Sequence, residues 1–148
     1  MTLPKSRYLA QRLLTYEAVA GKDSETAESA AFRVSAKLRW PLITLAGVVG
    51  FRSLLSRALN LAMAEAPSLR AVQIAPDGSL QGLDELEPKI GKDLAREGGA
   101  ILIAQLIGLL LIFIGEGLTL QMVQDVWPEA DFDDGVFERE RGKVEHSG

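Results

Sequence analysis

The longest apolar stretch of the chain runs from residue 98 to residue 123, and within residues 101–115 the single polar side chain is Gln105. Leu, Ile and Ala dominate the stretch, and it is far too long for an ordinary strand, so the pattern predicts a helix over about residues 93–125. At 1.5 Å per residue, roughly 20 apolar residues span the ~30 Å hydrocarbon core of a bilayer. Residues 98–120 reach that length.

The small and polar residues of this predicted helix fall on one narrow stripe when successive residues are placed about 100° apart. Most of its leucines and Phe113 face the other way. A stripe of small and polar residues is typical of the surface where helices meet inside a bilayer, because small residues permit close backbone approach and polar ones bond across the contact. The predicted helix–helix interface therefore consists of Ala104, Gln105, Gly108, Ile112, Gly115, Glu116 and Thr119.

This pattern fits two environments. A helix that is apolar nearly all round can cross a membrane, or it can form the core of a soluble helical bundle. Glu116 is the one ionisable group in the apolar stretch. Its carboxylate is expected near the end of the helix, paired with a cation of a neighbouring helix or close to lipid headgroups.

Two further helices are predicted before this stretch. Apolar residues recur at helical spacing after Pro4 and predict a short amphipathic helix that ends at Gly21. A longer helix follows, in which the apolar run 42–51 leads into an amphipathic segment with a basic face, giving a helix at about 42–65. Pro41 lacks an amide hydrogen and crowds the preceding turn, so a kink or break is expected there.

Residues 71–81 contain two short β-like segments around Pro76-Asp77-Gly78, a sequence typical of a tight turn. The expected fold is mostly all-α: an antiparallel helical hairpin or bundle with a small β-hairpin-like connection. Residues 1–128 form one helical domain in this interpretation. Residues 129–148 form an acidic and then mixed tail, whose composition predicts a flexible segment or a surface strap.

An antiparallel pairing of helices 42–65 and 93–125 fixes a rough register. Equal rise per residue places opposite each other those residues whose numbers sum to roughly 158. Gln105 is then level with Arg52 and Ser53, and Glu116 lies within reach of Arg39. Arg39, Arg52 and Ser53 are therefore the candidate polar partners of the stripe.

The same pairing places Trp40 and Trp127 at one end of the molecule, as in the aromatic belts at membrane interfaces. Lys and Arg near the two termini outnumber those in the 66–97 connection. In a membrane protein this difference predicts that both termini face the cytoplasm.

Composition excludes several kinds of chemistry. There is no cysteine, so disulfides and thiolate metal sites are absent. The net charge of −4 does not indicate a nucleic-acid-binding protein, which is typically basic. No phosphate-binding loop or dinucleotide motif occurs, and the only histidine, His146, lies in the polar tail. The acidic residues at 131–134 match a calcium loop poorly. No catalytic residue, cofactor, metal or small-molecule substrate is therefore predicted, and we expect a protein that is not an enzyme.

The stretches GFRSLLSRALNLA and AQLIGLLLIFIGEGLTLQMVQDVWP resemble those of a group of bacterial proteins of similar size with no assigned function. The resemblance covers much of residues 30–128. It implies a bacterial protein but no activity and no site residues.

Together these observations predict a small interaction or accessory subunit associated with the bacterial inner membrane, with lipid and a protein partner or second copy as its contacts. The alternative is a soluble, cytoplasmic helical bundle whose apolar helix is buried in its own core, in a homo-oligomer or under a partner. A third class, an ion- or proton-handling membrane protein, would use Glu116.

Overall fold

The computed structural model of the protein describes residues 4–20, 29–83 and 85–130. These residues are mostly α-helical, with one small two-stranded sheet, which confirms the predicted fold class. The elements in chain order are α1 (Pro4–Ala20), α2 (Ala30–Glu65), the 3-10 helix η2 (Pro67–Ala71), β1 (Gln73–Ile74), β2 (Leu80–Gln81), α3 (Leu86–Ile90), α4 (Lys92–Phe113) and α5 (Gly115–Val126). The predicted tail from residue 131 lies outside the described residues.

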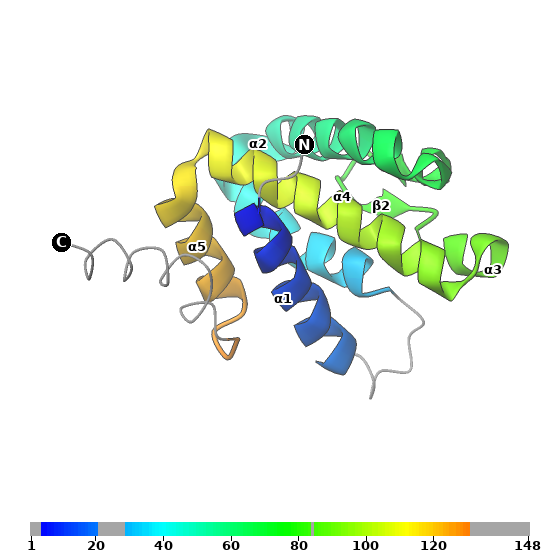
Figure 1. The fold of residues 1–148 in the computed structure, drawn as a ribbon. Coiled ribbons are helices and arrows are strands. Elements are labelled where there is room, and N and C mark those ends of the chain that lie inside the picture. The colour runs from blue at the N-terminus through cyan, green and yellow to red at the C-terminus, as the bar shows by residue number, and fades with distance from the viewer. Residues whose placement is uncertain (1–3, 21–28, 84, 131–148) are drawn as a thin grey trace.

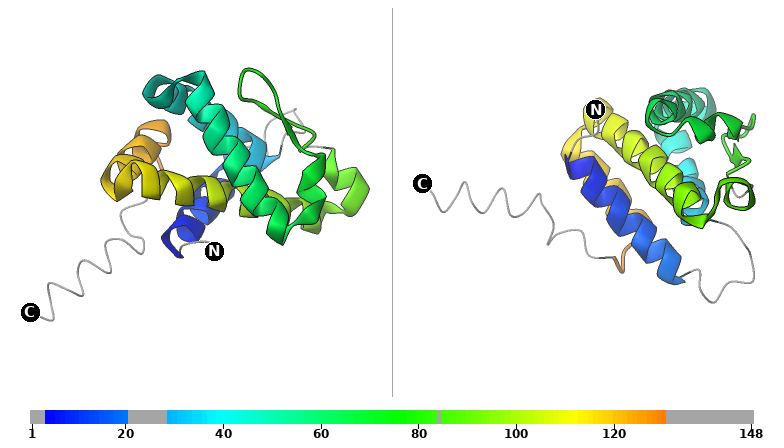
Figure 2. Two further views of the ribbon diagram at one scale, coloured as in Figure 1. Left: turned by 90° about the horizontal axis from the view of Figure 1, so that it is seen from above. Right: turned by 45° about the vertical axis from the view of Figure 1, so that its right-hand side comes forward.

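Helix α4 is the centre of the fold. It packs mainly against α2 and α1, with α3 at its first end and α5 at its second (Figures 1 and 2). An unbroken run from Leu102 to Ile107 is buried, so α4 is covered on most of its sides. The other helices of the chain therefore cover most of the apolar side chains of α4.

Helix α2 bends sharply at Gly47, and its two halves diverge from that point (Figure 2). Gly47 has φ 79° and ψ 165°, a backbone conformation that is open essentially to glycine alone. The break expected at Pro41 is instead at Gly47, and Pro41 lies inside the helix. The glycine decides the position because the bend requires a positive φ, which proline cannot adopt.

The helix predicted over 93–125 is two helices in the structure. Helix α4 ends at Phe113, and α5 begins at Gly115, whose φ is 86°. Ile114 and Gly115 thus form a corner at which the chain changes direction (Figure 1). The break escapes detection by hydropathy because the apolar run continues up to it and apolar residues recur after Glu116.

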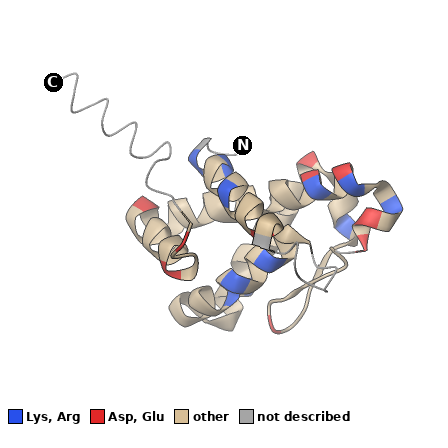
Figure 3. Cartoon of the chain, turned by 90° about the horizontal axis from the view of Figure 1, so that it is seen from below, with Lys and Arg blue, Asp and Glu red and all other residues tan. Residues whose placement is uncertain are grey.

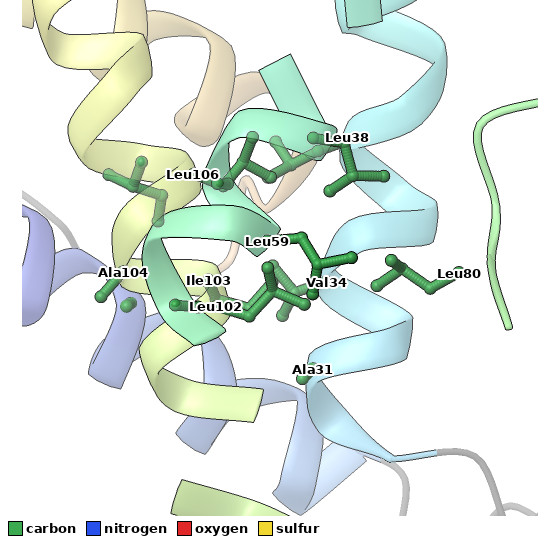
Figure 4. Packing of buried hydrophobic residues seen from close by; sticks show 14 of the residues in the cluster. Ala31, Val34, Leu38, Leu59, Leu80, Leu102, Ile103, Ala104 and Leu106 are labelled. Carbon is green, nitrogen blue, oxygen red and sulfur yellow. The ribbon is translucent and has the colours of Figure 1, made fainter. Parts of the chain in front are cut away.

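The core lies between α4 and both halves of α2. Figure 4 shows Val34 and Leu38 of the first half and Leu59 of the second half packed with Leu102 and Leu106 of α4. Gly98 and Gly99 do not kink α4. A Cβ on Gly99 would lie 2.8 Å from that of Ala31, so this glycine permits α2 and α4 to approach closely.

The predicted hairpin is present and rests on α2. Its strands pair antiparallel, with Gln73 opposite Gln81 and Ile74 opposite Leu80. The amide of Gly78 donates to the carbonyl of Ala75 at 2.9 Å and closes the turn. A two-stranded hairpin is marginal alone, and here buried Leu80 joins the helical core.

Candidate functional site

The predicted interface stripe of α4 and α5 is split between several environments. Ala104, Gln105 and Thr119 are buried. Gly108 lies beside Ser6 of α1. Gly115 forms the corner between the two helices. These positions therefore bring α4 close to α1 as well as to α2.

Two members of the stripe depart from the prediction. Ile112 points outward and is 73% exposed. Glu116 does not meet Arg39, because Lys5 of α1 donates to its carboxylate at 2.8 Å. Arg39 instead binds the hairpin turn, with distances of 3.2 Å to the carbonyl of Asp77 and 3.3 Å to its carboxylate.

The predicted antiparallel register is also wrong. The amide of Gln105 donates to the carboxylate of Glu65 at 3.0 Å, far along α2 from Arg52 and Ser53. The second half of α2, which contains Arg52, Ser53 and Glu65, lies at an angle to α4 and does not run alongside it (Figure 2). Arg52 and Ser53 are exposed, on an outward face of α2.

Exposed apolar side chains gather at two turns of the chain. We call residues 44–50 the α2 apex; Leu45 and Val48 are exposed there, and Val49 is 76% exposed. We call residues 112–118 the α4–α5 corner; besides Ile112, Phe113 is 67% exposed and Leu118 is exposed. Both turns lie toward the end of the molecule opposite α3 (Figures 1 and 2).

Charge is distributed unevenly between the two ends. No charged residue occurs from residue 40 to residue 51 or from residue 98 to residue 115. Figure 3 shows the α2 apex free of charge, whereas α3 and the beginning of α4 carry closely spaced acidic and basic residues. One end of the molecule thus exposes apolar side chains, with Glu116 of the corner paired to Lys5, and the other end carries many charges. We refer to the apex and the corner together as the apolar end.

Two helices, Ala30–Glu65 and Lys92–Phe113, are long and apolar enough to cross a membrane. They differ in how the fold uses them. Within the most apolar window, 56% of the residues of α4 are buried inside the protein but only 28% of those of α2. Of these two helices, α2 therefore has the larger share of its apolar window left uncovered.

A buried charge cluster, which sequence reasoning missed, joins α1, α2 and the residue after α5. The carboxylate of Glu17 is fully buried and accepts hydrogen bonds from Arg33 at 3.1 Å, from Lys37, and from the indole nitrogen of Trp127 at 2.8 Å. The sequence did contain a signal. Glu17 continues the 9-13-17 row of the core-facing side of α1, where an apolar residue is expected.

Burial by itself raises the pKa of Glu17, but the hydrogen bonds from Lys37 and Trp127 and the charges of Lys37 and Arg33 outweigh it. The net pKa therefore lies below its usual value, and the carboxylate is ionised in the native protein. Trp127 is only 2% exposed, so it is not the interfacial tryptophan that the sequence suggested, whereas Trp40 is exposed. The cluster connects α1, α2 and the residue after α5.

Within the described ranges, no three His, Asp or Glu side chains are placed to hold a metal ion. No family model, curated protein or solved structure matches this chain. The resemblance to an uncharacterised bacterial group consequently stays a prediction.

Proposed function

We propose that the protein is a non-catalytic accessory or interaction subunit that binds the surface of a membrane through its apolar end. The observation that carries the proposal is that two separate turns, the α2 apex and the α4–α5 corner, expose large apolar side chains at the same end of the molecule. Large apolar side chains exposed together at one end of a protein are typical of membrane or protein contact sites.

The fold favours shallow insertion over a helix that crosses the bilayer. Helix α2 bends at Gly47, and the half before the bend, residues 30–46, is about 25 Å long at 1.5 Å per residue. That is shorter than the ~30 Å hydrocarbon core. Helix α4 is long enough, but it packs against α1. A transbilayer α4 would carry Lys5, Arg7 and Arg12 of α1 into the lipid, where cations are costly.

Shallow insertion of the exposed apolar side chains of the apex and the corner meets neither difficulty. At the apex, the ten uncharged residues from Leu42 to Phe51 are flanked by Arg39 and Arg52. An apolar segment bordered in this way can enter the boundary between headgroups and acyl chains by roughly 5–10 Å while the cations stay in water. The cytoplasmic face of a bacterial inner membrane is the location that we propose.

Flotation with phospholipid vesicles tests the proposal. We expect the purified protein to float with the vesicles, and the double variant Val49→Glu/Phe113→Glu to stay behind, because each carboxylate must be desolvated on insertion. Leu94→Glu is the matched control, since Leu94 is an exposed leucine at the beginning of α4, away from the apolar end. It should float as the unaltered protein does.

The outcome also separates the alternatives. If the unaltered protein does not float, the membrane proposal is wrong. If, in addition, it sediments as a dimer or larger assembly that Val49→Glu/Phe113→Glu dissociates, then the apolar end is an interface in a soluble homo-oligomer. Circular dichroism of each variant establishes that loss of binding is not loss of folding.

A further inference from the structure

The outward face of the second half of α2 carries a row of polar and basic side chains that begins at the apex. It consists of Arg52, Ser53, Ser56, Arg57 and Asn60, and with Val49 and Leu61 these residues line an open concavity of about 770 Å³. All five polar residues are exposed, and the lining contains no acidic residue. We call this surface the basic face of α2.

The arginines of the basic face lack the carboxylate partners that four other cations of the fold have. Lys5 pairs with Glu116, Arg33 and Lys37 with Glu17, and Arg39 with Asp77. Arg52 and Arg57 form no ion pair with any residue in the described part of the chain. Two unpaired guanidinium groups among hydroxyl and amide donors are suited to an anion with several acceptor oxygens.

We propose that the basic face of α2 binds the phosphate groups of anionic phospholipids, an inference that rests on the proposed membrane contact of the apolar end. The position of the basic face next to the apex favours lipid as the source of the phosphate. Along the helix, Arg52 is about 5 Å and Arg57 about 12 Å from Val49, at 1.5 Å per residue. When Val49 enters the acyl boundary, both guanidinium groups are therefore near the headgroup layer.

The two parts of the contact have different roles. The apex supplies apolar insertion, which depends little on the charge of the lipid. The basic face supplies selectivity for anionic lipid, because each Arg near an anionic surface adds to the attraction and because salt screens that attraction. The protein should therefore prefer vesicles that contain phosphatidylglycerol over vesicles of phosphatidylcholine alone.

The test compares binding of the full chain to both kinds of vesicle. Arg52→Gln/Arg57→Gln should lower affinity for phosphatidylglycerol vesicles about tenfold or more, at roughly 1 kcal/mol for each arginine. Its binding to phosphatidylcholine vesicles should be unchanged. The matched control is Arg70→Gln/Arg96→Gln, which removes two exposed arginines outside the basic face and should bind both kinds of vesicle normally.

Four results would overturn the inference. Equal affinity of the unaltered protein for both vesicles, or an Arg52→Gln/Arg57→Gln variant that keeps the full preference, removes the basic face as a lipid site but leaves the apolar contact intact. Displacement from phosphatidylglycerol vesicles by millimolar inorganic phosphate at constant ionic strength assigns the face to free phosphate instead. Absence of binding to every vesicle overturns the proposed function together with this inference.

Discussion

The indole nitrogen of Trp127 donates a hydrogen bond of 2.8 Å to the carboxylate of Glu17, across 110 residues of chain. Both side chains are buried, and Arg33 and Lys37 of α2 approach the same carboxylate. One buried carboxylate thereby connects α1, the first half of α2 and the residue that follows α5. It fixes α1 against α2 and anchors the segment that follows α5.

Trp127→Phe should destabilise the protein by about 1–3 kcal/mol, because it removes one donor from a buried carboxylate while keeping most of the apolar contact. Urea unfolding followed by circular dichroism measures the change. Trp40→Phe is the control, since Trp40 is exposed and takes no part in the cluster. It should alter stability by no more than about 0.5 kcal/mol. Equal effects of the two substitutions would contradict the role given to Trp127.

Glu17→Gln should destabilise the protein by about 1–3 kcal/mol at neutral pH, because the charge-assisted hydrogen bonds are lost while Arg33 and Lys37 keep some access to water. The difference should depend on pH. The native pKa of Glu17 is lowered, so its ionisation stabilises the fold above the unfolded value of about 4.3. That contribution disappears as pH falls through the native pKa.

Unfolding experiments at a series of pH values check this sign. The stability difference between the unaltered protein and Glu17→Gln should be constant above about pH 5 and should shrink at lower pH. A difference that grows on acidification would show that the native pKa of Glu17 is raised and that burial dominates its environment.

Gly47→Ala tests the bend in α2. A Cβ at this position meets no atom within 4 Å, but φ is 79° and ψ is 165°, so the expected loss of about 1–3 kcal/mol comes from backbone strain alone. Gly117→Ala is the matched control, because its Cβ also has open space and its helical φ is negative. Helix propensity predicts a gain of up to about 1 kcal/mol there. Thermal unfolding of the two variants should therefore shift in opposite directions.

Thr119→Val should leave stability unchanged or raise it by about 1 kcal/mol. Its hydroxyl is fully buried and has no hydrogen-bond partner among the described residues, so the native protein already carries the cost of desolvation. Valine keeps the shape of the side chain without the polar atom. A loss of more than about 1 kcal/mol in chemical unfolding would indicate that the hydroxyl is bonded in solution.

Apolar periodicity predicted the main helical segments, and the turn sequence at residues 76–78 predicted the small hairpin, because both signals come from residues close together in sequence. Hydropathy could not locate the bends. Gly47 lies within an apolar run and Gly115 at the end of one, and only the backbone angles distinguish them from a helical glycine such as Gly117. The break was predicted at Pro41 because proline is the stronger helix breaker, yet Pro41 lies within α2.

The error in register came from the assumption that the two helices run alongside each other. The second half of α2 lies at an angle to α4, so Gln105 meets Glu65 (Figure 2). Glu116 pairs with Lys5 of α1, a helix that the hairpin interpretation omitted. Long-range polar pairs of this kind depend on tertiary geometry and have no local signature. The exposed apolar end is likewise a property of the fold, since buried and exposed leucines look alike in the sequence.

The central claim is that the α2 apex and the α4–α5 corner enter lipid. The chain has no cysteine, so Val49→Cys, Phe113→Cys and Leu94→Cys each provide a unique site for an environment-sensitive fluorophore. On addition of phosphatidylglycerol-containing vesicles, labels at positions 49 and 113 should shift to the blue and be quenched by nitroxide lipids. The label at position 94 should do neither. Labels at 49 and 113 that keep their aqueous spectra at saturating lipid would contradict the account.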